Sequence, residues 1–278
     1  MFLKMRTFYC LTLLSLFFLV SCNEYQKVLK NEDVKAKYDL AEKYYNEGDF
    51  KRANRLFEQI APRYVGKPQG ERVMFFFADT YFNTEQYYLA GYQFERFIKS
   101  YPNSDKLQEA VFREAKSYYE LSPRYSLDQT DTDKALAKLQ NFINTYPQSE
   151  FFAEANEMAQ ELTLKKQKKE YEIAKQFDKL GEFNYPILVS SIKAFNNFVT
   201  DNPGSIYRED AFFYRLKSEM TLANNSIITK QKERYREALK YYQALIKSYP
   251  DTKYRKEVDD FYEKIQEELQ LPTEAVSK

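Results

Sequence analysis

Side chains that could carry out covalent chemistry are scarce in this chain of 278 residues. It contains no histidine, which excludes a Ser-His-Asp triad, a Cys-His pair and every zinc site that uses imidazole. Neither Gly-rich phosphate-binding pattern, G-x-x-x-x-G-K-[ST] or G-x-G-x-x-G, occurs. Acidic residues are plentiful, but nothing in the sequence singles out a catalytic pair among them. We therefore expect no enzyme, no catalytic residue, no metal or cofactor, and no small-molecule substrate.

One of the two cysteines, Cys22, offers a different chemistry because a short apolar segment precedes it. Lys4 and Arg6 form a basic start, and fourteen residues then form an apolar run that contains Cys10. This run is too short to span a bilayer, which takes ~20 residues, so it is typical of a cleaved secretory signal. It ends in the letters LVSC, the pattern at which bacterial lipoproteins are cleaved and acylated on the cysteine.

Two interpretations of this N-terminus stay open. In the favoured one, residues 1–21 are a lipoprotein signal peptide, Cys22 carries the acyl chains, and residues 22–33 form a polar, lipidated tether. More than one acyl chain holds a protein stably on a membrane, and Asn23 is compatible with sorting to the outer membrane. We therefore expect lipid anchoring at the periplasmic face of the outer membrane. In the other, the signal peptide is an ordinary one and the cysteine stands there by chance.

Charge and composition indicate a helical protein without a nucleic-acid partner. The 42 basic residues are balanced by 41 acidic ones, so no net charge attracts nucleic acid or acidic lipid. Glycine is rare, with six residues, whereas tyrosine and phenylalanine number 25 and 23. Tryptophan is absent from the sequence. Abundant charged residues together with Lys, Glu, Ala, Leu and Tyr favour solvated helices over strands.

A phrase that recurs four times organises the chain. Each copy runs from an apolar residue through Tyr or Asn and a proline to Ser or Thr. The copies are FIKSYPNS at 97–104, FINTYPQS at 142–149, FVTDNPGS at 198–205 and LIKSYPDT at 245–252. Proline cannot continue a helix, and a hydroxyl side chain favours a helix N-cap, so we expect each phrase to end one helix and cap the next.

The phrase belongs to the tetratricopeptide pattern, a helix hairpin of 34 residues. Residues 73–104 fit that pattern without a gap, with small Ala78 and Ala90 where the two helices approach and Pro102 at the close. Gly48 is expected to end the first helix of repeat one. Repeats three and four carry insertions between their helices. We predict an all-α tetratricopeptide-repeat solenoid of five helix hairpins plus a C-terminal capping helix over 254–269.

This pattern predicts the domain organisation of the mature chain. Repeats one to three should occupy 34–150, and repeats four and five with the capping helix should occupy 151–270. The remaining residues, 271–278, have the composition of a disordered tail.

The first helices of such repeats line a groove, and their free positions can encode binding. Two positions, three residues before and four after the small alanine, share a helix face. In the first three repeats these six positions are all aromatic: Tyr38, Tyr45, Phe75, Phe82, Phe112 and Tyr119. We predict an aromatic groove for a peptide with apolar or aromatic side chains, with Arg72, Asp79 and Lys116 on the same face. The alternative is that these aromatics fill the core between repeats.

The whole mature chain, from Cys22 to about Leu269, resembles the BamD family of outer-membrane assembly lipoproteins. Its most specific segments are YDLAEKYYNEGDFKRANRLFEQIAPRY at 38–64, AGYQFERFIKSYPNS at 90–104 and YYQALIKSYPDT at 241–252. The family also places a long connection inside its third repeat. The high Lys, Asn, Tyr and Phe content is similar to that of a Bacteroidetes-type member.

The resemblance implies a non-catalytic role at the outer membrane. Members bind BamA, the β-barrel insertase, and help deliver nascent outer membrane proteins to it. Their N-terminal repeats are thought to recognise an aromatic-rich C-terminal signal, and their C-terminal repeats dock on a POTRA domain of BamA. The docking uses a basic residue in the second helix of repeat four. Here Ala194 takes the aligned place, and the nearest basic residue is Lys193.

Other functions on the same fold stay open. A cell-envelope coordinator associated with Tol-Pal would share the repeats, but the lipobox and the repeat count argue against it. A SusD-like glycan-binding lipoprotein is longer and stacks sugars on tryptophan, which this chain lacks. A superhelical lytic transglycosylase needs an added catalytic domain, for which the repeats leave no room.

Overall fold

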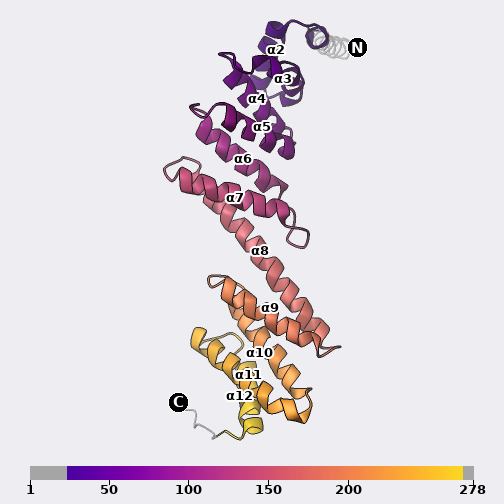
Figure 1. The fold of residues 1–278 in the computed structure, drawn as a ribbon, viewed down its shortest axis with the longest axis vertical. Helices are drawn as coiled ribbons and strands as arrows, with labels where there is room; N and C mark the ends of the chain where they lie inside the picture. The colour runs from indigo at the N-terminus through magenta and orange to yellow at the C-terminus, as the bar shows by residue number, and fades with distance from the viewer. Residues whose placement is uncertain (1–23, 272–278) are drawn as a thin grey trace, which may run out of the picture. The chain divides into compact units, whose positions relative to one another are not determined.

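The computed structural model describes residues 24–271, in which every regular element is a helix (Figure 1). A first helix spans 24–30. The others are α2 (Val34–Asn46), α3 (Phe50–Tyr64), α4 (Gly70–Asn83), α5 (Tyr87–Ser100), α6 (Leu107–Leu121), α7 (Thr130–Thr145), α8 (Phe152–Gly181), α9 (Ile187–Asp201), α10 (Arg208–Asn224), α11 (Ile228–Ser248) and α12 (Arg255–Leu269). Taken in pairs from α2 to α11 they form five hairpins, and α12 follows the last. The predicted all-α repeat fold is thereby confirmed.

The chain divides into two compact units. Of the described residues, the first unit comprises 24–123 and 129–160, and the second comprises 124–128 and 161–271. The division falls within α8, a helix of 30 residues. The reason is that α8 starts at Phe152, far ahead of the segment around Ala174 that carries the repeat pattern. None of the helices over 24–271 combines the length and the apolar character needed to cross a membrane.

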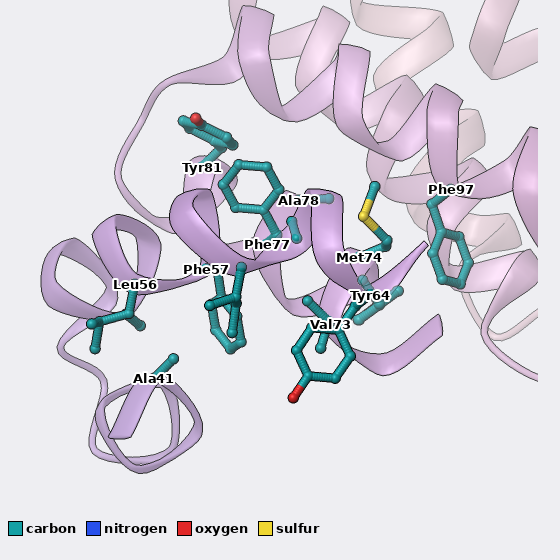
Figure 2. Packing of buried hydrophobic residues seen from close by; sticks show 14 of the residues in the cluster. Ala41, Leu56, Phe57, Tyr64, Val73, Met74, Phe77, Ala78, Tyr81 and Phe97 are labelled. Carbon is teal, nitrogen blue, oxygen red and sulfur yellow. The ribbon is translucent and has the colours of Figure 1, made fainter. Parts of the chain in front are cut away.

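The core of the first unit uses the small and large residues of the repeat pattern. Ala78 and Ala90 have no exposed surface, so α4 and α5 pack closely. Phe57, Phe94 and Phe97 are also fully buried and fill the space beside them. Figure 2 shows side chains of α3, α4 and α5 in this cluster. Burial of each such ring stabilises the fold by about 1.5–3 kcal/mol.

The core of the second unit follows the same rule. Ala211 of α10 and Ala238 of α11 are fully buried, as is Phe195 of α9. The final helix, α12, buries Val258 and Ile265, which lie seven residues apart on one face. Its other positions are largely polar and solvated, so α12 closes the second unit as predicted for a capping helix.

The recurring phrase ends the second helix of four hairpins. α5, α7, α9 and α11 each end two residues before the proline of the phrase. In α5 the intervening residue, Tyr101, donates its backbone N–H to the carbonyl of Phe97 at 2.9 Å. The same bond recurs at Tyr146, Asn202 and Tyr249. The phrase is therefore a helix stop, because proline has no N–H with which to extend the helix.

The hydroxyl that ends the phrase does not cap the next helix as expected. α6 begins only at Leu107, and its N-cap residue, Lys106, makes no side-chain cap. Instead, the Oγ of Ser104 accepts the backbone N–H of Lys106 at 2.9 Å and donates to Oε1 of Glu71 at 2.5 Å. Glu71 lies in the first turn of α4, so the hydroxyl joins successive repeats. Corresponding bonds to an earlier first helix are made by Ser149 to Gln108 and by Thr252 to Glu209.

Two glycines meet requirements that other residues could not meet. Gly48 follows the end of α2 with φ of +79°, so it supplies the left-handed residue predicted there. Gly70 opens α4, and a Cβ on it would lie 2.2 Å from the carbonyl oxygen of Tyr64. The close passage of α4 over the end of α3 therefore requires the missing side chain.

The segment predicted to be a tether is partly folded. Its residues 24–30 form a helix, and Tyr25 is buried against Tyr44 with ring centroids 5.7 Å apart. Val28 and Leu29 pack against the same cluster. The polar appearance of the segment conceals these three apolar positions, which share one helix face. Residues 1–21, Cys22 and the end of the tail lie outside the described residues, so their predicted roles stay predictions.

Candidate functional site

The six aromatic residues predicted to line a groove lie on α2, α4 and α6, the first helices of three successive hairpins. Two of them are core residues, with Phe75 only 5% and Phe112 only 2% exposed. The other four, Tyr38, Tyr45, Phe82 and Tyr119, are half-buried. For Phe75 and Phe112 the alternative interpretation, that they fill the core, is therefore the correct one.

The two buried rings are held by aromatic neighbours from the second helices and, for Phe112, also from the connection that follows α7. Phe75 makes edge-to-face contacts with Phe94 and Phe97 of α5, at centroid distances of 5.8 and 5.5 Å. Phe112 contacts Phe142 of α7 at 5.5 Å and stacks on Phe151, in the connection after α7, at 4.6 Å. In these two hairpins the position three residues before the small alanine thus points toward the second helix.

A network of polar side chains centred on Asp79 links α2, α4 and α6, the first helices of the first three hairpins. The hydroxyl of Tyr45, on α2, donates to Oδ2 of Asp79 at 2.7 Å. Asn83 Nδ2 donates to the same oxygen at 2.8 Å, and Arg113 Nη1, on α6, lies 3.6 Å from Oδ1. Asp79 is only 4% exposed, and its Oδ1 has no hydrogen-bond partner among the described residues. The carboxylate therefore orders three helices rather than reaching freely toward a ligand.

The hydrogen-bond network around Asp79 changes the ionisation of Tyr45. Burial raises the pKa of the Tyr45 hydroxyl far above its ordinary value, and the adjacent Asp79 carboxylate raises it further. Tyr45 therefore stays a neutral hydrogen-bond donor at any physiological pH. Its ring stacks on Phe76 at a centroid distance of 4.1 Å, which extends the aromatic surface from α2 onto α4.

A hollow of about 480 Å³ opens beside this aromatic surface. It is lined by Pro68, Glu71, Arg72, Phe75, Phe76 and Lys106. The guanidinium of Arg72 lies 5.2 Å from the centre of the Phe76 ring, and the amine of Lys106 lies 5.4 Å from that of Phe75. Two cations thus stand over an aromatic floor, an arrangement that suits a ligand with an apolar or aromatic side chain and a negative group.

Some of the predicted polar residues lie on this face, and others form ion pairs that hold them against neighbouring residues. Arg72 remains 57% exposed although it pairs with Glu42. Lys116 pairs with Glu154 at 2.7 Å and lies over the Phe112 ring, so it covers the core. Phe82 packs beside the guanidinium of Arg113 at 5.2 Å and keeps part of its ring exposed.

Three residues of this face were missed from the sequence: Phe76, Lys106 and Arg113. Phe76 and Arg113 each stand two residues before the small alanine of their first helix, so the repeat alignment could have found them. Lys106 belongs to the turn between repeats, where the alignment assigns no role. We name the set of Tyr45, Arg72, Phe76, Phe82, Lys106 and Arg113 the aromatic face.

In the second unit Lys193, the predicted partner contact, is exposed on α9. Ala194 beside it is half-buried and packs against the second core, so only Lys193 is free to meet a partner. Within 24–271 no three Cys, Asp or Glu side chains gather closely enough to hold a metal ion.

A family model named YfiO, described as "Outer membrane lipoprotein", matches residues 30–187, and a tetratricopeptide repeat model matches residues 228–252. None of the curated proteins matches the chain.

Two solved repeat proteins are similar at low identity. The TPR2AB domain of yeast Sti1, solved in complex with pHSP90, is 13% identical with a TM-score of 0.39, covering 84% of this chain and 98% of its own. A variant of the putative kinesin light chain TPR-like repeats of Podosopora anserina is 14% identical with a TM-score of 0.33, covering 84% and 93%.

Proposed function

The chain belongs to the YfiO (BamD) family of outer membrane lipoproteins, and we propose that it is a non-catalytic subunit of the machinery that assembles β-barrel proteins in the outer membrane. The observation that carries this proposal is the family match, which covers residues 30–187. The five hairpins support it, because stacked repeats offer extended surfaces for partner proteins. Acyl chains on Cys22 would hold the protein at the periplasmic face of the membrane.

We propose two partners for the two units. The second unit binds a POTRA domain of a BamA-like insertase, with Lys193 of α9 as a contact, since this exposed amine stands beside the position that the family uses. An amine gives a less directional ion pair than a guanidinium, so neighbouring residues must share the recognition. The first unit binds segments of nascent outer membrane proteins on the aromatic face.

The hollow beside Phe76 supports the second partner. Its floor is apolar, and its two cations, Arg72 and Lys106, stay 57% and 56% exposed although they pair with Glu42 and Glu109. A β-strand that ends in an aromatic residue presents an apolar ring and a carboxylate within one residue. Such an end can place the ring over Phe76 and the carboxylate near the cations, which accounts for a preference for aromatic C-terminal signals.

Peptide binding tests this proposal. A fluorescently labelled peptide of the C-terminal strand of an outer membrane β-barrel, ending in phenylalanine, should bind the chain, as measured by fluorescence anisotropy. Arg72→Ala and Phe82→Ser should each weaken binding about tenfold, the loss typical of a central contact. Neither should unfold the chain, because both side chains are partly exposed.

Matched controls come from α5. Arg96→Ala and Tyr92→Ser remove the same kinds of side chain from exposed positions outside the aromatic face. Both should leave the affinity unchanged. Equal losses in the test and control variants, or no binding by the unaltered chain, would refute the peptide-binding role of this face.

A further inference from the structure

Six large apolar side chains lie exposed on two turns of the second unit and on the helix ends beside them. They are Leu180, Phe183, Tyr185, Val189, Ile227 and Ile228. Phe183 and Ile228 are 84% and 80% exposed, the highest fractions among the large hydrophobic residues described. A single exposed apolar residue needs no explanation, but a group of six marks an interaction surface. We call these residues the apolar edge.

The two turns are neighbours in space. One joins α8 to α9 and the other joins α10 to α11, and α10 packs against both α9 and α11 (Figure 1). Leu188, at the start of α9, is buried together with Leu222, near the end of α10. Lys217 Nζ of α10 also lies 3.7 Å from Oε1 of Glu182 in the first turn. The apolar side chains therefore belong to one edge of the unit.

The first turn is held in a fixed shape. A Cβ on Gly181 would lie 2.2 Å from Cδ2 of Leu188, so the end of α8 touches the start of α9 directly. Backbone bonds from Phe183 and Asn184 to the carbonyl of Leu180 close the turn, both at 3.1 Å. Phe183 is thus presented outward by a tight turn and cannot fold back onto the core.

The charges around the apolar edge favour an anionic surface. Lys179, Lys230 and Lys232 are exposed, and none of them has an ion-pair partner within the described chain. Two glutamates lie in the same stretches: Glu182 is paired with Lys217, and Glu233 follows Lys232 at an exposed position. Aromatic and aliphatic side chains flanked by lysines are the composition found where proteins lie in the interfacial region of a bilayer.

We propose that the apolar edge is a second membrane contact, by which the lipoprotein rests on the bilayer that carries its anchor. The family location supplies that bilayer. The side chains stand on projecting turns rather than in a hollow, so a deformable lipid surface can cover them where a folded protein would need a matching cavity. This contact requires neither peptide binding nor the insertase. An experiment can therefore refute the membrane contact without affecting the proposed function, or refute the proposed function without affecting the membrane contact.

Tryptophan fluorescence tests this proposal. The chain contains no tryptophan, so all indole emission comes from the single residue that is introduced. The full chain carrying Phe183→Trp is purified from membranes and reconstituted with its anchor on vesicles of phosphatidylethanolamine and phosphatidylglycerol. Its emission should shift to shorter wavelength, and lipids with a nitroxide at a shallow depth should quench it. Adding Ile227→Ser and Ile228→Ser should lower that quenching about twofold or more, because apolar area leaves the lipid.

Tyr88→Trp is the matched control, since Tyr88 is 67% exposed on α5 of the first unit. Its emission should match that of the detergent-free protein in solution and resist quenching. Two results would overturn the proposal. One is an indole at position 183 that stays as solvated and unquenched as the control. The other is a shift that appears only after purified insertase is added, which would assign the apolar edge to a protein partner.

Discussion

Replacing Phe75 by serine should lower the free energy of unfolding of the first unit by about 3–5 kcal/mol, the usual cost of removing a buried phenylalanine ring. The ring is 5% exposed and contacts Phe94 and Phe97 edge to face. Serine would leave a cavity among these rings and place a hydroxyl without a partner inside it. Because small domains are stable by only about 5–15 kcal/mol, the loss should be plain in chemical denaturation followed by circular dichroism.

Phe82→Ser provides the comparison on the same helix. Phe82 is half-buried and lies beside Tyr87 and Arg113, so its loss should cost about 1 kcal/mol. The two variants therefore separate stability from binding. Phe75→Ser should mainly lower the free energy of unfolding, and Phe82→Ser should mainly lower the affinity for the peptide. Similar stabilities for both would show that Phe75 is not the core residue that its contacts indicate.

The second unit should lose stability as the pH rises from about 4.5 to 7, through the carboxyl of Glu219. Burial raises the pKa of this group from 4.5 to about 7, and Glu237 and Glu233 act in the same direction. Arg234 opposes the shift, but its Nη1 lies 4.0 Å from Oε1 of Glu219, too far for a hydrogen bond.

The sign follows from proton binding. Between pH 4.5 and 7 the folded chain keeps the proton of Glu219 while the unfolded chain releases it. The folded state then binds more protons, so this group contributes most stability below pH 4.5 and loses it by pH 7. A shift of this size corresponds to about 3 kcal/mol.

Glu219→Gln isolates that contribution, because the amide has nearly the shape of the protonated carboxyl and cannot titrate. We expect the free energy of unfolding of the variant, minus that of the unaltered chain, to be about 3 kcal/mol larger at pH 8 than at pH 4. Urea unfolding at both pH values measures this difference. Glu263→Gln, at an exposed position of α12, is the control for the substitution itself. If the difference between Glu219→Gln and the unaltered chain is the same at both pH values, burial has not shifted this group.

Much of the fold was predictable because the repeat pattern records packing directly. Small alanines such as Ala78 and large rings such as Phe94 recur at fixed spacing, and each proved to be buried. The early start of α8 was not predictable, since its first half carries no repeat signature. The helix over 24–30 was missed for a similar reason, as Tyr25 packs against a partner distant in sequence, Tyr44.

The candidate site was predicted less well, because spacing on a helix does not say which neighbour a side chain meets. Phe75 and Phe82 share a face by sequence, yet Phe75 turns toward α5 and Phe82 remains partly exposed. Asp79 was predicted as a ligand contact, but it is 4% exposed, and its Oδ2 already accepts from the hydroxyl of Tyr45 and the amide of Asn83. Such assignments depend on residues in adjacent repeats, which a single repeat cannot reveal.

The central claim is that the chain serves β-barrel assembly in the outer membrane. An affinity-tagged form, recovered from detergent-solubilised outer membranes, should bring with it a BamA-like β-barrel insertase. Lys193→Glu should reduce that recovery, whereas Lys247→Glu, at another exposed lysine of the second unit, should not. Recovery of Tol-Pal components or of a TonB-dependent glycan importer in place of the insertase would contradict the account.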